Sequence, residues 1–132
     1  MKLVTTGYPL PVSARLIQIL ETEISKSSVI QTEPIYINFR DPGYSAETGG
    51  FHPVEVMVTD QRIQYCTDFM YYGSGPWAEL GKDLDFDFSL GLFQQQGQDH
   101  PIERGRSMFA LWTQNFCDYY AMGVYTVSIT NG

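Results

Sequence analysis

The chain has 132 residues, of which 43% are apolar and 14% aromatic, enough for one domain with a self-sufficient core. Fifteen acidic residues against eight basic ones give a net charge of −7, which disfavours direct binding to nucleic acid. No apolar run approaches the length of a membrane span, and no signal-peptide pattern is visible. We therefore predict a single globular domain over residues 1–132, located in the cytoplasm and without a membrane partner.

The first predicted elements are a helix and a strand. Apolar residues recur at helical spacing within residues 12–25; they are Leu16, Ile17, Leu20 and Ile24. Residues 35–40 alternate between apolar and polar side chains, which predicts a strand. A loop is predicted over residues 41–50, which contain two proline–glycine or glycine–glycine pairs.

Two further strands follow this loop. Val54, Val56 and Val58 alternate with polar or longer side chains, and residues 59–61 form a short connection to a strand over Ile63–Tyr72. A connection this short predicts an antiparallel hairpin. Simple alternation predicts that one face of the later strand is shared by Ile63, Tyr65, Thr67, Phe69 and Tyr71.

The clearest alternation in the chain runs from Asp83 to Phe93 and predicts a fourth strand. Its apolar face consists of Leu84, Phe86, Phe88, Leu90 and Leu92. Asp83, Asp85 and Asp87 occupy the opposite face, which we interpret as solvated rather than as a metal site. Binding of a metal ion or a basic partner by this face is the alternative.

The remaining residues predict a loop over Gln94–Arg106, a helix over residues 107–122 and a last strand over residues 124–130. The order is therefore helix, four strands, helix, strand. Helices separated from runs of strands with short turns indicate an α+β fold, with two principal helices and a mainly antiparallel sheet of about five strands.

Three blocks of sequence stand out as a set: residues 39–55, which begin Phe-Arg-Asp-Pro-Gly-Tyr, residues 84–88 with Leu-Asp-Phe-Asp-Phe, and residues 111–125 with Leu-Trp-Thr-Gln-Asn-Phe-Cys. Together they resemble a family of small uncharacterised bacterial proteins, a domain of unknown function. The resemblance implies a single compact domain of bacterial origin. It implies no activity, cofactor or catalytic residue.

No catalytic motif is visible. Cys66 and Cys117 are widely spaced and are predicted to be reduced thiols, with Cys117 inside an aromatic-rich helix that suggests a buried position. The glycine-rich loops lack the lysine of a phosphate-binding loop and the dinucleotide fingerprint. We assign no catalytic residue, no metal ligand and no cofactor from the sequence.

Loop residues are the strongest candidates for binding an unknown protein or small ligand, because loops carry function disproportionately and aromatic and arginine side chains are enriched at binding hot spots. The predicted set is Arg40, Asp41, His52, Trp77, His100 and Arg104. The leading hypothesis is a non-catalytic cytoplasmic binding or adaptor domain that uses its long loops.

Two alternatives stay open. The first is a small enzyme that uses His52 or His100 with a nearby acid, and convergence of the two histidines in a deep pocket would favour it. The second is an acidic decoy or inhibitor of a basic nucleic-acid-binding protein. That function requires a continuous acidic surface built around Asp83, Asp85 and Asp87.

Overall fold

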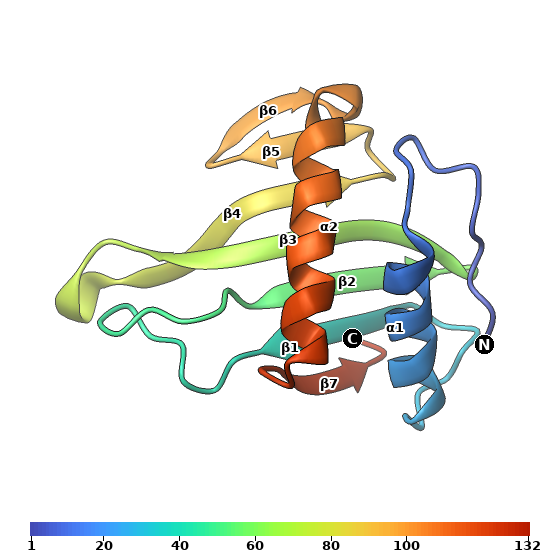
Figure 1. The fold of residues 1–132 in the computed structure, drawn as a ribbon, viewed down its shortest axis with the longest axis horizontal. Coiled ribbons are helices and arrows are strands. Elements are labelled where there is room, and N and C mark those ends of the chain that lie inside the picture. Colours follow the sequence, from blue (N-terminus) through green and yellow to red (C-terminus); the bar gives the residue numbers. More distant parts are fainter.

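Two helices pack on one face of a seven-stranded antiparallel sheet in the computed structural model, which describes residues 1–132 (Figure 1). The helices are α1 (Ala14–Ser25) and α2 (Arg106–Ala121). The strands are β1 (Ile35–Arg40), β2 (Val54–Thr59), β3 (Arg62–Tyr72), β4 (Glu79–Asp87), β5 (Leu92–Gln95), β6 (Gln98–Pro101) and β7 (Thr126–Thr130). Their order in the sheet is β6-β5-β4-β3-β2-β1-β7, so the predicted α+β class is confirmed.

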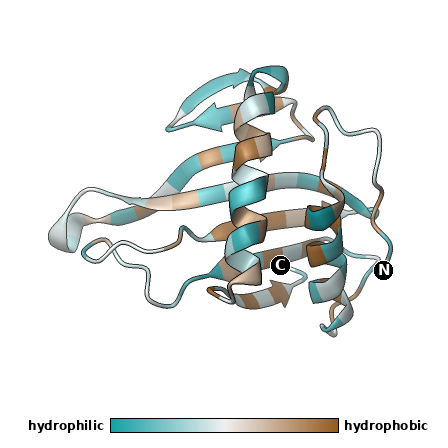
Figure 2. Cartoon of the chain, in the orientation of Figure 1, coloured by the Kyte–Doolittle hydropathy of each residue, from teal (hydrophilic) through white to brown (hydrophobic).

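The helix α1 begins where the sequence provides a cap. The Ser13 hydroxyl accepts a hydrogen bond from the backbone N–H of Leu16 at 3.1 Å, which satisfies one of the free donors at a helix start. The predicted apolar stripe is buried against the sheet, and Figure 2 shows the matching apolar bands on α1, β1 and β2. The helix begins at Ala14 rather than at residue 12.

The helix α2 crosses the strands and contributes the largest aromatic residues of the core (Figure 1). Phe109, Trp112 and Phe116 lie on one side of it, and Tyr125 follows the helix. Successive ring centroids along this series are 6.0, 5.2 and 5.5 Å apart, with interplanar angles of 17°, 10° and 30°. This aromatic column and their burial make Trp112 and Phe116 core residues of α2.

The sheet has seven strands, not five, because two predicted segments divide differently. The apolar alternation of Asp83–Phe93 runs through a turn: β4 ends at Asp87, whose carboxylate accepts from the Leu90 N–H at 2.9 Å, and β5 begins at Leu92. The predicted loop over Gln94–Arg106 contains the second half of β5, all of β6 and the 3₁₀ helix η2 (Ile102–Gly105). A second 3₁₀ helix, η1 (Gly75–Trp77), lies in the β3–β4 connection.

The predicted shared face of β3 is wrong because the strand contains an irregularity. Ile63 pairs with Val58 and Tyr65 pairs with Met57, so Gln64 is an extra residue in the ladder. One extra residue shifts the side-chain alternation by one position. Ile63 is consequently in the core with Cys66, whereas Tyr65 lies on the other face and donates to Glu55.

The expected solvated acidic face is also corrected. Asp85 does lie on the other face of the sheet from Phe86. It is only 7% exposed, however, and it accepts hydrogen bonds from Thr67 at 2.8 Å and from Lys82 at 3.1 Å. A buried carboxylate with two donors is a structural group rather than a free surface charge.

Asp85→Asn should therefore lower the free energy of unfolding by about 1 kcal/mol, because an amide oxygen still accepts from Thr67 but the charge-assisted bond to Lys82 is lost. Glu79→Gln, at an exposed position of the same strand, is the matched control and should change stability by less than about 0.5 kcal/mol. Urea denaturation measures both, and equal stability of Asp85→Asn and the wild type would contradict this account.

Both cysteines are buried and unbridged in the structure. Complete burial raises the pKa of the Cys66 thiol well above its ordinary value, and burial also raises that of Cys117. These thiols are packing groups of the core. Neither helix has the length and apolarity needed to cross a membrane.

Candidate functional site

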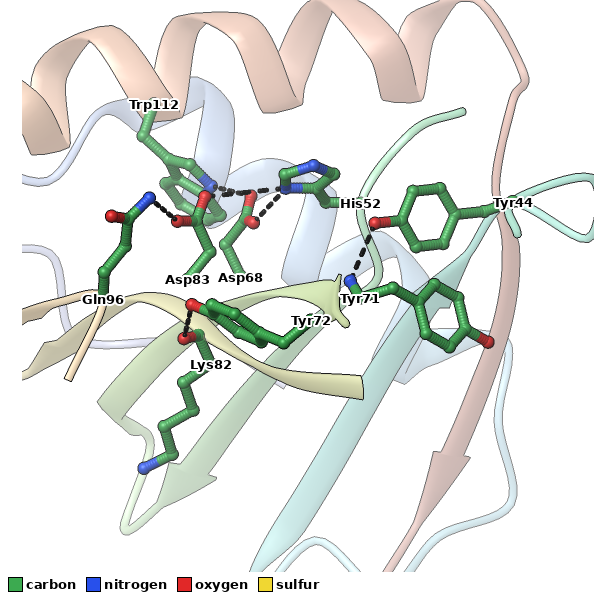
Figure 3. A network of polar contacts seen from close by, with 9 residues as sticks. All are labelled: Tyr44, His52, Asp68, Tyr71, Tyr72, Lys82, Asp83, Gln96 and Trp112. Atoms are coloured by element: carbon green, nitrogen blue, oxygen red, sulfur yellow. Dashed lines mark hydrogen bonds and ion pairs between the residues drawn. The ribbon is translucent and has the colours of Figure 1, made fainter. Parts of the chain in front are cut away.

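A polar cluster lies between the sheet and α2 and joins four separate segments of the chain (Figure 3). His52 comes from the end of the β1–β2 loop, Asp68 from β3, Asp83 from β4 and Trp112 from α2. The His52 Nδ1 is 2.7 Å from Asp68 Oδ1 and 3.7 Å from Asp83 Oδ2. One ligand atom from each of these three residues lies within 4.8 Å of the others.

Asp68 is the centre of this network and is 9% exposed. Its Oδ1 accepts from His52 Nδ1, and its Oδ2 accepts from the Trp112 indole N–H at 3.0 Å. A carboxylate partner at Nδ1 places the hydrogen on that nitrogen and leaves Nε2 available to a ligand or a proton. The arrangement therefore fixes both the orientation and the tautomer of His52.

Asp83 reaches the cluster through a β-bulge. Asp68 pairs with Leu84 and Phe69 pairs with Lys82, so Asp83 is an extra residue between them. Bulges redirect a side chain that strict alternation would place on the other face. The redirected carboxylate is close to His52, and its Oδ1 is 3.5 Å from the side-chain amide of Gln96, which donates to it.

The electrostatics of the cluster favour a protonated His52. The hydrogen bond to Asp68 raises the pKa of His52 above its ordinary value, partial burial opposes the rise, and the charges of Asp68 and Asp83 add to it. Two carboxylates against one imidazolium leave a net negative charge at this point. The arrangement can bind a cation, or it can hold and transfer a proton at Nε2.

The loop that carries His52 is shaped by Asp41. The Asp41 carboxylate accepts from the backbone N–H groups of Gly43 at 2.8 Å and Phe51 at 3.0 Å. Gly50 has φ +137°, and a Cβ there would lie 2.8 Å from Asp41 Oδ2, so this position requires glycine. These contacts tie the end of the loop, next to His52, back to its start after β1.

A pocket of about 330 Å³ opens next to the cluster, between α2 and the residues that precede β2. It is lined by Gly50, Phe51, His52, Asp68, Trp112, Asn115, Phe116, Tyr119 and Tyr125. The lining combines aromatic walls with a few polar groups, which is typical of small-ligand sites. The lining contains no lysine or arginine. Burial, together with the charges of Asp68 and Asp41, raises the pKa of Tyr125, so its hydroxyl stays protonated.

The structure brings two of the six predicted loop residues to this region: His52 lines the pocket, and Asp41 supports its loop. Arg40 is exposed at the end of β1, and Trp77 is 81% exposed at the tip of the β3–β4 hairpin. His100 on β6 and Arg104 in η2 lie near the opposite edge of the sheet.

Two features distinguish the alternative functions: the distance between the two histidines and the continuity of the acidic surface. Three strands separate His100 on β6 from the start of β2, where His52 lies, so the histidines do not converge. His52 nevertheless has an acid partner in Asp68. The continuous acidic surface that a decoy requires is not formed around the three aspartates, because Asp85 is buried and Asp83 turns toward His52.

The sequence patterns give no indication of Asp68, Asn115 or the polar role of Trp112, and they place Asp83 on a solvated face, with metal or basic-partner binding as the alternative. Asp68 lies on the core side of β3, but the alternation of that strand was misread because of the extra residue Gln64. The helical spacing of Trp112 is typical of a core residue, and nothing in that spacing shows where its N–H points. A buried indole does need an acceptor, and that requirement is the signal that predicts a nearby carboxylate or carbonyl.

Comparison with known proteins identifies relatives of undetermined function. The chain matches the family described as protein of unknown function (DUF2787) over residues 14–130. A hypothetical protein from the VSP-II pathogenicity island of Vibrio cholerae is 35% identical, with a TM-score of 0.81 and coverage of 96% of this chain and 99% of that one. Curated proteins give no match.

A conserved hypothetical protein from pathogenicity island VPI-2 of Vibrio cholerae is also 35% identical, with a TM-score of 0.82 and coverage of 96% of this chain and all of that one. That protein is described as sharing structural homology with the human P32 protein. The resemblance noted in the sequence is confirmed. The chain belongs to this bacterial DUF2787 family, whose function is unknown.

Proposed function

We propose that the protein is a ligand-binding domain and that its ligand occupies the aromatic pocket beside His52. The observation that carries the proposal is the meeting of an aromatic-walled cavity with a polar group, His52, whose orientation is fixed by Asp68. Such preorganisation lowers the entropic cost of binding a ligand at that group. The role is non-catalytic, and the partner is a small molecule or a side chain presented by another protein.

The pocket lining indicates what such a ligand contains. The walls of the pocket are largely aromatic, so the part of the ligand that enters it is apolar or planar. His52 and Asn115 both line the cavity, and their side chains carry hydrogen-bonding groups. A compact ring or branched group with one polar substituent matches these features.

Trp112 provides a direct test, because it lines the pocket and the only other tryptophan, Trp77, is exposed. In a Trp77→Phe background, the emission of Trp112 can be titrated with benzyl alcohol, benzylamine and benzoate, which share a ring and differ in charge. We expect saturable quenching by at least one of these probes. No change with any of them up to their solubility limits would contradict a pocket for ring-bearing ligands.

Asn115→Leu should weaken binding of the responding probe about fivefold to tenfold, because one hydrogen bond contributes roughly 1 kcal/mol. Gln114→Leu is the matched control. It removes a side-chain amide from the preceding residue of α2, which borders a different cavity. Isothermal titration calorimetry measures both. Equal affinities of the two variants would show that the probe binds elsewhere.

A second candidate function is acid–base catalysis, favoured by the hydrogen bond between His52 and Asp68. A carboxylate on Nδ1 leaves Nε2 to exchange a proton with a substrate, which is the arrangement of many hydrolases. Turnover of p-nitrophenyl acetate that is lost in His52→Gln, with probe binding retained, would favour this function over the non-catalytic one.

Two further elements of the proposal concern partner and location. Trp77 is the most exposed of the large hydrophobic side chains, at the tip of the β3–β4 hairpin, and exposed tryptophans are frequent anchors in protein interfaces. We infer that it contributes to contact with a protein partner.

Two reduced, buried thiols support a cytoplasmic location.

A further inference from the structure

We propose that His52, Asp68 and Asp83 form a binding site for one divalent transition-metal ion, with Zn²⁺ or Mn²⁺ as the expected classes. The site adjoins the aromatic pocket but does not depend on the proposed function of that pocket. It revises the interpretation of Asp83 as part of a solvated acidic face.

The spacing of the three groups is that of metal ligands. With metal–ligand bonds of roughly 2.0–2.2 Å, neighbouring ligand atoms are about 3.0–3.6 Å apart, the shorter value at octahedral and the longer at tetrahedral angles. The His52 Nδ1 lies 2.7 Å from Asp68 Oδ1 and 3.7 Å from Asp83 Oδ2, and the three ligand atoms all lie within 4.8 Å of one another. Small side-chain adjustments are sufficient to bring all three into contact with one ion.

Each carboxylate is already oriented by a neutral donor that is not one of the three proposed ligands. The Trp112 N–H holds Asp68 Oδ2, and the Gln96 amide contacts Asp83 Oδ1. The other oxygen of each carboxylate points to His52 Nδ1, as Figure 3 shows. Outer-shell hydrogen bonds of this kind orient metal ligands and are typical of metal sites in proteins.

The negative charges of Asp68 and Asp83 also favour binding of a cation. The side chains of Asp68 and Asp83 are 12% and 18% exposed, and their shared counter-charge is one imidazole. Lys82, next to Asp83 in the chain, pairs with Asp85 on the opposite face of the sheet instead. Carboxylates removed from water are normally paired with cations or bound to metals, and a divalent ion would balance both.

The ligand types indicate which ion is suitable. Imidazole nitrogen suits Zn²⁺ and its transition-metal neighbours, whereas Ca²⁺ and Mg²⁺ favour oxygen ligands alone. Three protein ligands leave at least one coordination position for water or another ligand, as in open zinc sites. Binding displaces the hydrogen from Nδ1 of His52, so the metal replaces the His52–Asp68 hydrogen bond.

Calorimetric titration of EDTA-treated protein with ZnCl₂, MnCl₂ and MgCl₂ tests the site. We expect one Zn²⁺ or Mn²⁺ per chain with micromolar or tighter affinity, and at least 100-fold weaker binding of Mg²⁺. Asp83→Asn should weaken binding of the preferred ion at least 100-fold. Glu79→Gln, which removes one charge from an exposed position of the same strand, should leave it unchanged.

Co²⁺ substitution provides a readout that does not depend on the stability of a variant. Co²⁺ bound to nitrogen and oxygen ligands gives visible d–d absorption, and Mn²⁺ should selectively broaden the NMR signals of His52 and not those of His100. Broadening of neither histidine, or equal affinities of Asp83→Asn and Glu79→Gln, would overturn the proposal. Asn115→Leu should bind the metal normally, which separates a failure of this site from a failure of the pocket.

Discussion

Phe116→Ala is expected to lower the free energy of unfolding by about 3–5 kcal/mol, the usual cost of removing a buried aromatic ring. Phe116 is 2% exposed and lies in the middle of the aromatic column, between Trp112 and Tyr125. Its ring also meets Phe39 of β1 edge to face at a centroid distance of 4.9 Å. The substitution therefore removes contacts that join α2 to the sheet.

Leu111→Ala is the matched control for this prediction, because Leu111 belongs to the same helix and is 54% exposed. Alanine at that position should change stability by less than about 0.5 kcal/mol. Chemical denaturation followed by circular dichroism gives both values. A denaturation midpoint of Phe116→Ala equal to that of Leu111→Ala would contradict the central position of Phe116 in the core.

Asp68→Ala should lower the free energy of unfolding by about 2–3 kcal/mol, because it leaves the buried Trp112 N–H without an acceptor and creates a small cavity. Asp68→Asn should recover much of this loss, since an amide oxygen can still accept from the indole. Urea denaturation of the metal-free protein compares the two variants. Equal losses in both would show that the Trp112 hydrogen bond contributes little.

The same variants test the pH dependence of stability. Asp68 raises the pKa of His52 in the folded protein above its unfolded value of about 6.5. The stability gained from protonating His52 is therefore fully present below pH 6.5 and is lost as the pH rises through the folded pKa. In EDTA-treated protein, NMR titration should show a lower pKa for His52 in Asp68→Ala than in the wild type, and an unchanged value would refute this coupling.

Much of the framework could be predicted from periodicity. The stripe of α1, the alternation of β1 and β2 and the aromatic face of α2 each reflect one buried side, so sequence spacing and structure agree. The division of Asp83–Phe93 could not be predicted in this way. Phe88 and Leu90 continue the alternation through the turn, although Gly91, with φ +68°, follows directly.

The β5–β6 hairpin did have a local signal. Its two connecting residues, Gln96 and Gly97, both have positive φ, as a tight two-residue turn requires. A residue followed by glycine between short polar segments is a weaker sign of such a turn than asparagine–glycine. The polar composition of residues 94–106 is typical of a loop and hides this turn signal.

The candidate site was less predictable than the framework because it depends on irregularities in the sheet. The bulge at Asp83 places on the helix side a carboxylate that alternation assigns to the other face. Gln64 similarly changes which residues of β3 face α2, and Asp68 is among those that do. A single extra residue in a ladder leaves little trace in a period-two pattern, yet it decides which side chains meet.

The position of β7 has a consequence for how the chain folds. From β1 to β5 each strand pairs with the strand that follows it in sequence, so each of those ladders joins neighbouring segments of the chain. The β1–β7 ladder instead joins residues that are far apart in sequence, such as Ile37 and Ile129. Long loops are entropically costly to close before other contacts form. We therefore expect β7 to complete the sheet after α2 has formed, and the outer edge of β1 to stay unpaired until residues 126–130 have been made.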